Sequence, residues 1–170
     1  MPKLVPHPDH PPRAIEAIEA EVRCEGSIWH FDYRVKGDVA QLDLPPPEEP
    51  VRRDGLWEQS CFECFAACED KSYREFNFSP SGSYAAYAFD DYRHGQRDAA
   101  ATVSIETGQA PGEYHLSARL SANLGKVDAL ALTAVIEEKD GTKSYWALAH
   151  PEGHPDFHHP AGFVLPIEDI

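Results

Sequence analysis

The stretch LWEQSCFECFAAC, Leu56–Cys68, places three cysteines, one tryptophan and two glutamates within thirteen residues. It could be a metal or redox motif, or a β-strand. In a strand, adjacent side chains alternate between faces, so Cys61 and Cys64 would point to opposite sides. Cys64 and Cys68 would share a face about 13 Å apart, whereas a disulfide needs Cα atoms within about 7 Å. Only Cys24 remains elsewhere for a zinc site, so we interpret the stretch as a strand with small, buried, apolar thiols.

This strand would have one purely apolar face and one face that carries a carboxylate. We expect the core face to hold Phe62, Cys64, Ala66 and Cys68, and the other face Cys61, Glu63, Phe65 and Ala67. A carboxylate among aromatic rings must be paired or lie next to a solvent-filled groove. For Glu63 we therefore keep two alternatives, which are an ion pair across strands with Arg119 and contact with a ligand.

The same period of two recurs along the whole chain. Ile18–Cys24 and Trp29–Val35 alternate around a Glu25-Gly26 turn, which predicts a hairpin, although the Ala and Glu of the first run also permit a helix. Further short runs are Val39–Leu44, Tyr73–Phe78, Tyr84–Phe89, Ala101–Thr107, Tyr114–Leu120, Leu130–Glu137, Lys143–His150 and Phe163–Ile167. About ten strands with little helix predict an all-β antiparallel sandwich, jelly-roll or immunoglobulin-like. We expect a single domain over residues 1–170, beginning with an extended Pro-rich segment at residues 1–13.

Composition and charge limit the classes of partner. The chain has 15 Lys and Arg against 29 Asp and Glu, a formal charge of −14, which disfavours nucleic acid and membrane surfaces. No apolar run approaches the roughly 20 residues of a membrane-spanning helix, and no signal-peptide core is evident. We therefore expect a cytoplasmic protein with reduced thiols.

From Trp57 onward, the order WEQSCFECFAACEDKSYREFNFSPSGSYAAYAF resembles the signature of family 9 carbohydrate-binding modules and their DOMON-like relatives. The signature has a Trp, a polar turn, a strand with Glu before an aromatic residue, and a hairpin into an aromatic-polar strand. The closing SYWALAHPEGHPDFHHPAGFVLPI is similar to the family's last strands. The resemblance extends from about Ile15 to the end, and the matching residues are Trp57, Glu58, Gln59, Glu63, Phe65, Phe76, Asn77, Phe78, Trp146, Pro160, Gly162 and Leu165.

The resemblance implies a DOMON-type sandwich that holds a sugar between two tryptophans, with polar groups bonding its hydroxyls. By position, Trp57 and Trp146 would be the aromatic walls, and Glu63 and Asn77 would supply polar contacts. Asn77 stands where the family has a basic residue, a role that Arg74 could take. Ser60 replaces an expected acidic residue. The resemblance admits a calcium ion, and we name no other cofactor.

Histidines cluster in the late stretch HPEGHPDFHH, which contains His150, His154, His158 and His159. With Glu152 and Asp156 they could bind zinc or iron, but their spacing matches no motif with a known mechanism. Haem ligation by a Met–His pair is not available, because the only methionine is Met1. A zinc or haem site is therefore the alternative hypothesis, and a loop that shapes a ligand pocket is the simpler one.

Catalytic motifs are missing. SPSG at Ser79–Gly82 lacks the pattern of a nucleophile elbow, and no Gly-rich phosphate loop occurs. Glu58 and Glu63 could form an acid pair, and the charged loop Phe89–Gly95 is typical of a surface network. The sequence therefore predicts a non-catalytic β-protein that binds a carbohydrate-like or other polar small molecule. The alternatives are a metal- or haem-binding protein, or an interaction module without a working pocket.

Overall fold

The computed structural model describes all 170 residues and contains twelve strands and four short 3₁₀ helices, with no α-helix. None of these helices has the length and apolarity that a membrane-spanning helix requires. The strands, in chain order, are β1 Lys3–Pro6, β2 Ile15–Glu25, β3 Ile28–Gly37, β4 Cys61–Cys68, β5 Tyr73–Phe78, β6 Tyr84–Phe89, β7 Arg97–Asp98, β8 Thr102–Ala110, β9 Glu113–Ser121, β10 Val127–Glu137, β11 Lys143–Ala147 and β12 Leu165–Pro166. The helices are η1 Val39–Gln41, η2 Leu56–Glu58, η3 Pro160–Gly162 and η4 Ile167–Asp169.

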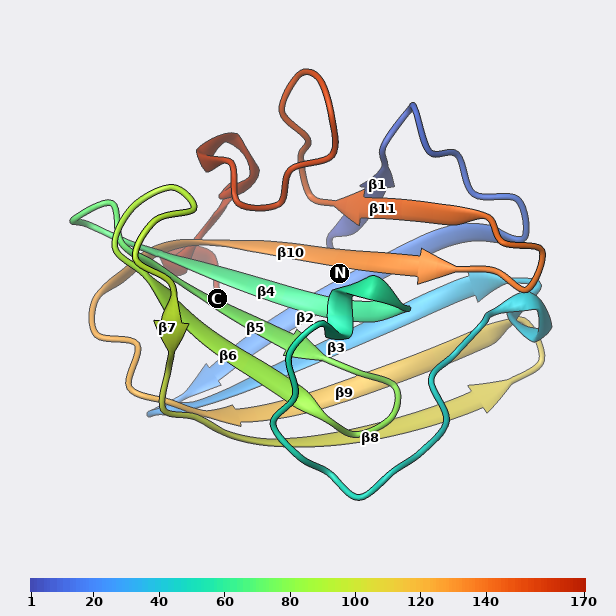
Figure 1. Cartoon of the computed structure of the whole chain (residues 1–170), viewed down its shortest axis with the longest axis horizontal. Helices are drawn as coiled ribbons and strands as arrows, with labels where there is room; N and C mark the ends of the chain where they lie inside the picture. The colour runs from blue at the N-terminus through green and yellow to red at the C-terminus, as the bar shows by residue number, and fades with distance from the viewer.

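The strands form one curled antiparallel sheet in the order β7-β6-β5-β4-β10-β11-β1-β2-β3-β9-β8, and β12 pairs with β10. Strand β1 joins the two halves of the sheet because it pairs with β11 on one side and β2 on the other. Figure 1 shows β4, β5, β6, β10 and β11 lying over β2, β3, β8 and β9. The all-β prediction is confirmed. The strand number is twelve instead of about ten, and the sheet is continuous.

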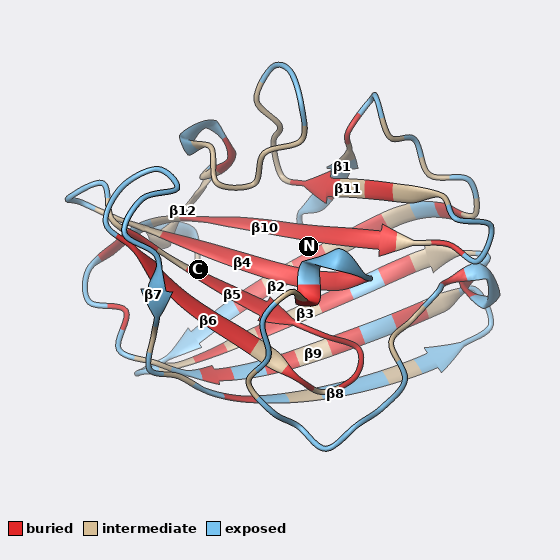
Figure 2. Ribbon diagram, viewed as in Figure 1, coloured by how far each residue is buried: buried red, intermediate tan, exposed pale blue.

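The main core lies between the two halves of this sheet and is rich in aromatic rings. Phe31 contacts Phe78 and Tyr33 contacts Phe62, with ring centroids 5.3 and 5.0 Å apart. Figure 2 shows that β4, β5, β6 and β10 are buried along nearly their whole lengths. Because these four strands are buried on both faces, their outer face, which points away from the main core, must also be covered.

Strand β4 has the two faces that the alternation predicted. Its apolar face, with Phe62, Cys64 and Ala66, belongs to the main core. Cys61 and Phe65 belong to a second, smaller apolar cluster on the outer face of the same strands. All four cysteines are free thiols, and Cys61 and Cys64 are buried. The interpretation as a strand is therefore confirmed for Cys61–Cys68, whereas Leu56–Glu58 forms η2 and Cys68 is half-buried.

Most predicted strands are present, and the first hairpin consists of strands rather than a helix. The run Val39–Leu44 is an exception, because it forms the 3₁₀ turn η1 and a single bridge at Leu42. Gly37 ends β3 with φ +134°, and a Cβ there would lie 2.5 Å from the carbonyl oxygen of Ala14. The positive φ and the close approach of the Ala14 backbone both favour glycine at this position, and the alternating pattern that follows does not continue as a strand.

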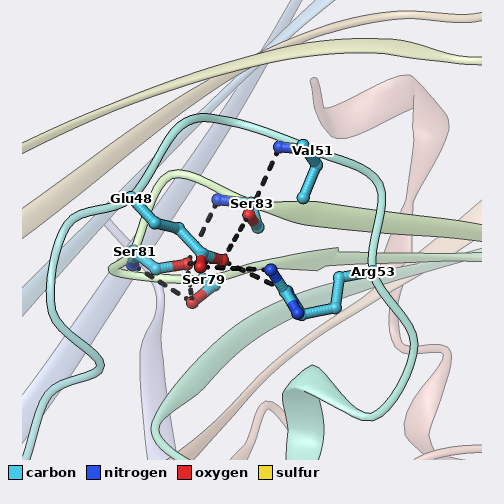
Figure 3. A network of polar contacts seen from close by, with 6 residues as sticks. All are labelled: Glu48, Val51, Arg53, Ser79, Ser81 and Ser83. Carbon is cyan, nitrogen blue, oxygen red and sulfur yellow. Dashed lines mark hydrogen bonds and ion pairs between the residues drawn. The ribbon is translucent and has the colours of Figure 1, made fainter.

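A Pro-rich segment, residues 45–55, crosses the end of the β5–β6 hairpin and leads into η2 (Figure 3). The Glu48 carboxylate accepts a hydrogen bond from Ser83 Oγ at 2.7 Å and pairs with Arg53 at 3.1 Å. The Val51 N–H donates to the same Ser83 oxygen at 3.3 Å. These contacts hold the segment against the hairpin. They thereby help to position η2, which carries Trp57.

Candidate functional site

A cavity of about 530 Å³ lies on the outer face of the half-sheet formed by β4, β5, β6, β10 and β11. The strands supply its floor through side chains that all point to the outer face of the sheet. These residues are Glu63, Phe65, Glu75, Tyr87, Phe89, Val135 and Tyr145. Loops supply the walls through His10, Trp57, Arg93, Gln96, Pro155, Phe157 and His158. The cavity thus combines aromatic rings with two carboxyl groups.

Glu63 is the most unusual floor residue, because it is only 2% exposed and has no charged partner in contact. Its Oε2 accepts a hydrogen bond from Thr133 Oγ1 at 3.3 Å, and its Oε1 has no partner. Burial, and then the charge of Glu75, raises the pKa of Glu63 well above its usual value. Glu63 therefore holds its proton more tightly than an exposed carboxyl group does. The alternative pairing with Arg119 is wrong, since Arg119 is exposed on β9 and Glu63 bonds to Thr133.

Glu75 is the second floor carboxyl, and it is 5% exposed. Its Oε1 accepts a hydrogen bond from Asn77 Nδ2 at 3.1 Å, and its Oε2 lies 3.6 Å from His158 Nε2. Burial raises the pKa of Glu75 to about 7, although the Asn77 hydrogen bond and the charge of Arg93 oppose this effect. Near neutral pH, Glu75 therefore changes between acid and carboxylate.

The tautomer of His158 follows from its neighbours. The Tyr73 hydroxyl accepts a hydrogen bond from the Arg93 N–H at 3.1 Å, so its own proton is directed to His158 Nδ1, 2.8 Å away. Burial lowers the pKa of His158 to about 4. The imidazole is thus neutral, and its remaining proton lies on Nε2, which faces Glu75.

Two loops that wall the cavity are tied to each other by Asp156. Arg93 Nη2 donates to Asp156 Oδ1 at 2.8 Å, and the Tyr92 hydroxyl donates to Oδ2. The charged loop Phe89–Gly95, expected as a surface network, does form such a network. In addition it brings Arg93 to the cavity.

The structure separates the two tryptophans that the resemblance placed together. Trp57 lies at the rim of the cavity and is 55% exposed. Trp146 is 2% exposed within the main core, and its indole N–H donates to Ser144 Oγ at 2.8 Å. Its neighbour Tyr145 lines the cavity instead. Trp146 therefore does not stand opposite Trp57 as a wall.

The two remaining predicted polar residues do not line the cavity. Asn77 is fully buried next to Glu63 in the register of β4 and β5, where it bonds to Glu75 and leaves its own Oδ1 without a partner. Arg74 precedes Glu75 in β5, so its side chain points to the opposite face of the sheet. Its guanidinium donates to the Tyr73 carbonyl oxygen at 3.3 Å. Glu58, the suggested acid partner of Glu63, is exposed and lies outside the cavity lining.

The four late histidines have separate contacts. His150 Nε2 bonds to the Val5 carbonyl oxygen at 2.8 Å, His159 Nδ1 accepts from the Ala161 N–H, and His154 is exposed. No group of three or more His, Cys, Asp or Glu side chains is placed to hold a metal ion. His158 is the only one of the four histidines that lines the cavity, together with Pro155 and Phe157 of the same stretch, so the stretch acts here as a loop that shapes a pocket.

Several cavity residues were not singled out from the sequence, above all Glu75. Glu75 could have been found from the sequence. Tyr73, Glu75 and Asn77 alternate along one strand and therefore point to the same face, and Asn77 was already a predicted site residue. His10, Tyr145 and Phe157 come from segments far apart in the chain. Their meeting depends on how the sheet curls, which no local pattern encodes.

The fold and the site define an all-β protein with an aromatic cavity over two buried carboxyl groups. The sequence matches no protein-family model and is not significantly similar to any curated protein. The structure is similar to that of a candidate carbohydrate-binding protein from Bacteroides uniformis ATCC 8492, with a TM-score of 0.63 and 16% identity over 92% of this chain and 79% of that one. At this identity the likeness shows a shared fold alone.

A second structure is more distant. It is a family 9 carbohydrate-binding module from Caldicellulosiruptor kristjanssonii in complex with glucose, with a TM-score of 0.46 and 11% identity over 81% of this chain and 69% of that one.

Proposed function

We propose that this chain binds a carbohydrate, or a similar polyhydroxylated small molecule, in the cavity above β4 and β5. The observation that carries the proposal is Glu63 Oε1, a buried polar atom without a partner at an aromatic cavity. Leaving such a group unsatisfied costs about 1–3 kcal/mol. A ligand hydroxyl that bonds to this oxygen would remove that cost.

The other residues of the cavity suit the same class of ligand. The C–H faces of a sugar ring pack on aromatic side chains, while a few polar groups fix its orientation. Phe65, Tyr145 and Phe157 offer such rings, and the exposed Trp57 can cover a ligand at the rim. The volume of about 530 Å³ lies in the usual range for small-molecule sites.

The fold likeness to the Bacteroides uniformis protein supports the proposal. We also propose the finer fold assignment, a DOMON-type jelly roll, on the sequence resemblance described above. No comparable observation favours the alternative hypothesis that the histidine stretch binds a metal ion or haem.

Calorimetric titration with a panel of neutral mono- and disaccharides tests the proposal. We expect at least one sugar to bind, and Glu63→Ala to weaken its affinity by about tenfold or more, since a buried hydrogen bond contributes about 1–3 kcal/mol. We expect Trp57→Ala to weaken binding as well. Val164→Ala is the matched control for Trp57, because Val164 is 49% exposed and lies outside the cavity. No binding by the wild type, or equal binding by Glu63→Ala, would refute the proposal.

Tryptophan fluorescence offers an independent readout. Trp29 and Trp146 are buried, whereas Trp57 is exposed at the cavity rim, so a bound ligand should change mainly the emission of Trp57. A saturable change that persists in Trp57→Phe would place the ligand elsewhere.

A further inference from the structure

The cavity floor carries two carboxyl groups in different surroundings. Glu63 pairs with Asn77, and Phe65 pairs with Glu75, in the register of β4 and β5. Glu63 and Glu75 are therefore diagonal neighbours on one face, whose Cα atoms in such a ladder lie about 7–8 Å apart. Both line the same cavity. A sugar ring lying on this floor would meet both groups at once.

The surroundings give each carboxyl group a different hydrogen-bonding capacity. Glu63 lines the cavity, and its buried Oε1 has no hydrogen-bond partner within the chain, so a sugar oxygen that reaches this atom would be its first partner. Glu75 receives the Asn77 amide hydrogen and faces the Nε2 proton of His158. Donors aimed at a carboxyl group favour its anionic form. The floor thus places a proton donor next to a group arranged to be a proton acceptor.

We propose that this cavity catalyses the interconversion of the anomers of a reducing sugar, with Glu63 as the general acid and Glu75 as the general base. The inference rests on the proposed function, because the sugar must first bind. It goes beyond that function by assigning an activity.

The step consumes only the sugar. Glu75 takes the proton of the anomeric hydroxyl while Glu63 gives its proton to the ring oxygen. The bond between the anomeric carbon and the ring oxygen breaks, its electron pair goes to the ring oxygen, and a carbonyl group forms at the anomeric carbon. After the aldehyde rotates, the reverse transfers close the ring on the other face of the carbonyl and restore both carboxyl groups. Protons and electrons balance without a cofactor or a second reactant.

The separation of the two pKa values supports these roles. Burial and the charge of Glu75 raise the pKa of Glu63 well above its usual value, whereas the pKa of Glu75 is about 7. Two titratable groups whose surroundings push their pKa values apart are the usual arrangement for paired acid and base catalysis. The working form, acid at Glu63 and carboxylate at Glu75, becomes dominant as the pH rises through 7.

Polarimetry of freshly dissolved α-D-glucose, α-D-galactose and α-D-xylose, with calorimetry of the same sugars, tests the proposal. We expect the wild type to accelerate mutarotation of at least one sugar in proportion to protein concentration, with a rate that rises through pH 7. Loss of one acid or base costs about 10²–10⁴-fold, so Glu63→Gln and Glu75→Gln should each lower the rate at least 100-fold. Glu49→Gln is the control, since Glu49 is exposed and outside the cavity.

The outcomes separate activity from binding. A sugar that binds without faster mutarotation would overturn the activity and leave the proposed function intact, whereas no binding by any sugar of the wider panel of mono- and disaccharides would overturn both. Acceleration that Glu75→Gln retains would overturn the assignment of the base. If a Gln variant fails to fold, as judged by circular dichroism, the rate and pH profile of the wild type still decide. A rate equal to buffer alone, or one that does not change between pH 6 and pH 8, would refute the proposal.

Discussion

Replacing Glu75 with glutamine should make the protein less sensitive to rising pH. Glutamine has nearly the same shape, and its amide oxygen can still accept the hydrogen bond from Asn77 Nδ2, which is 3.1 Å long in the structure. The substitution removes the titrating group from the cavity floor and keeps its packing. Any pH-dependent difference between the two proteins then reports on the ionisation of Glu75.

The size of the effect follows from the pKa shift of Glu75. Its pKa rises from an ordinary 4.5 to about 7 in the folded protein, so the folded state binds the proton more tightly than the unfolded state does. The stabilisation is fully present below pH 4.5 and is lost as the pH rises through 7. At about 1.4 kcal/mol per pKa unit, the wild type should lose about 2–3 kcal/mol relative to Glu75→Gln between pH 5 and pH 8.

Urea unfolding of both proteins at pH 5, 6, 7 and 8 measures this difference. Groups such as His158 titrate in both proteins, so most of their contribution cancels when the free energies of unfolding are subtracted. Glu49→Gln, an exposed change, is the control and should give no trend. A difference between wild type and Glu75→Gln that stays constant over this range would refute the assignment of a raised pKa to Glu75.

Three further predictions concern the core and can be checked by urea unfolding. Tyr33→Phe removes the 2.7 Å hydrogen bond from the tyrosine hydroxyl to the buried Glu63 carbonyl oxygen, and should cost about 1–3 kcal/mol; an unchanged midpoint would contradict this. Phe62→Ala empties a fully buried site and should cost about 3–5 kcal/mol, whereas a loss below 1 kcal/mol would mean that the core collapses around it. Gly37→Ala places a Cβ 2.5 Å from the Ala14 carbonyl oxygen at φ +134°, and should destabilise by more than about 1 kcal/mol; wild-type stability would contradict the close approach.

The strands were predictable because their pattern is local. Alternation over Cys61–Cys68 gave the correct faces, and the runs Tyr73–Phe78 and Tyr84–Phe89 end where β5 and β6 end. These strands are buried on both faces, and the turn residues that bound each short apolar run are enough to place them. The run Val39–Leu44 is not a strand, because after Gly37 the chain forms η1 and a single bridge at Leu42, which the local alternation does not predict.

The site was only partly predictable, for a reason that Trp146 illustrates. Trp146 and Tyr145 are neighbours in one strand and therefore point to opposite faces of the sheet. Both faces of this half-sheet are covered, so either ring could have been the core residue. The choice depends on which face meets the other half of the sheet. Glu63 was recognisable because a carboxylate between aromatic residues is unusual in either position.

The carboxyl groups on the cavity floor are difficult to explain by stability alone. Their neighbours Phe65 and Val135 show that this face can be apolar, and buried ionisable groups are often replaceable by apolar residues without loss of stability. Here Glu63 has an unpartnered oxygen, and burial raises the pKa of Glu75, so its ionisation as the pH rises through 7 destabilises the folded state. Both features cost folding free energy, which the hydrogen bonds from Thr133 to Glu63 and from Asn77 to Glu75 offset only in part. Because their cost falls when a polyhydroxylated ligand bonds to the two groups, ligand recognition explains their presence better than packing does.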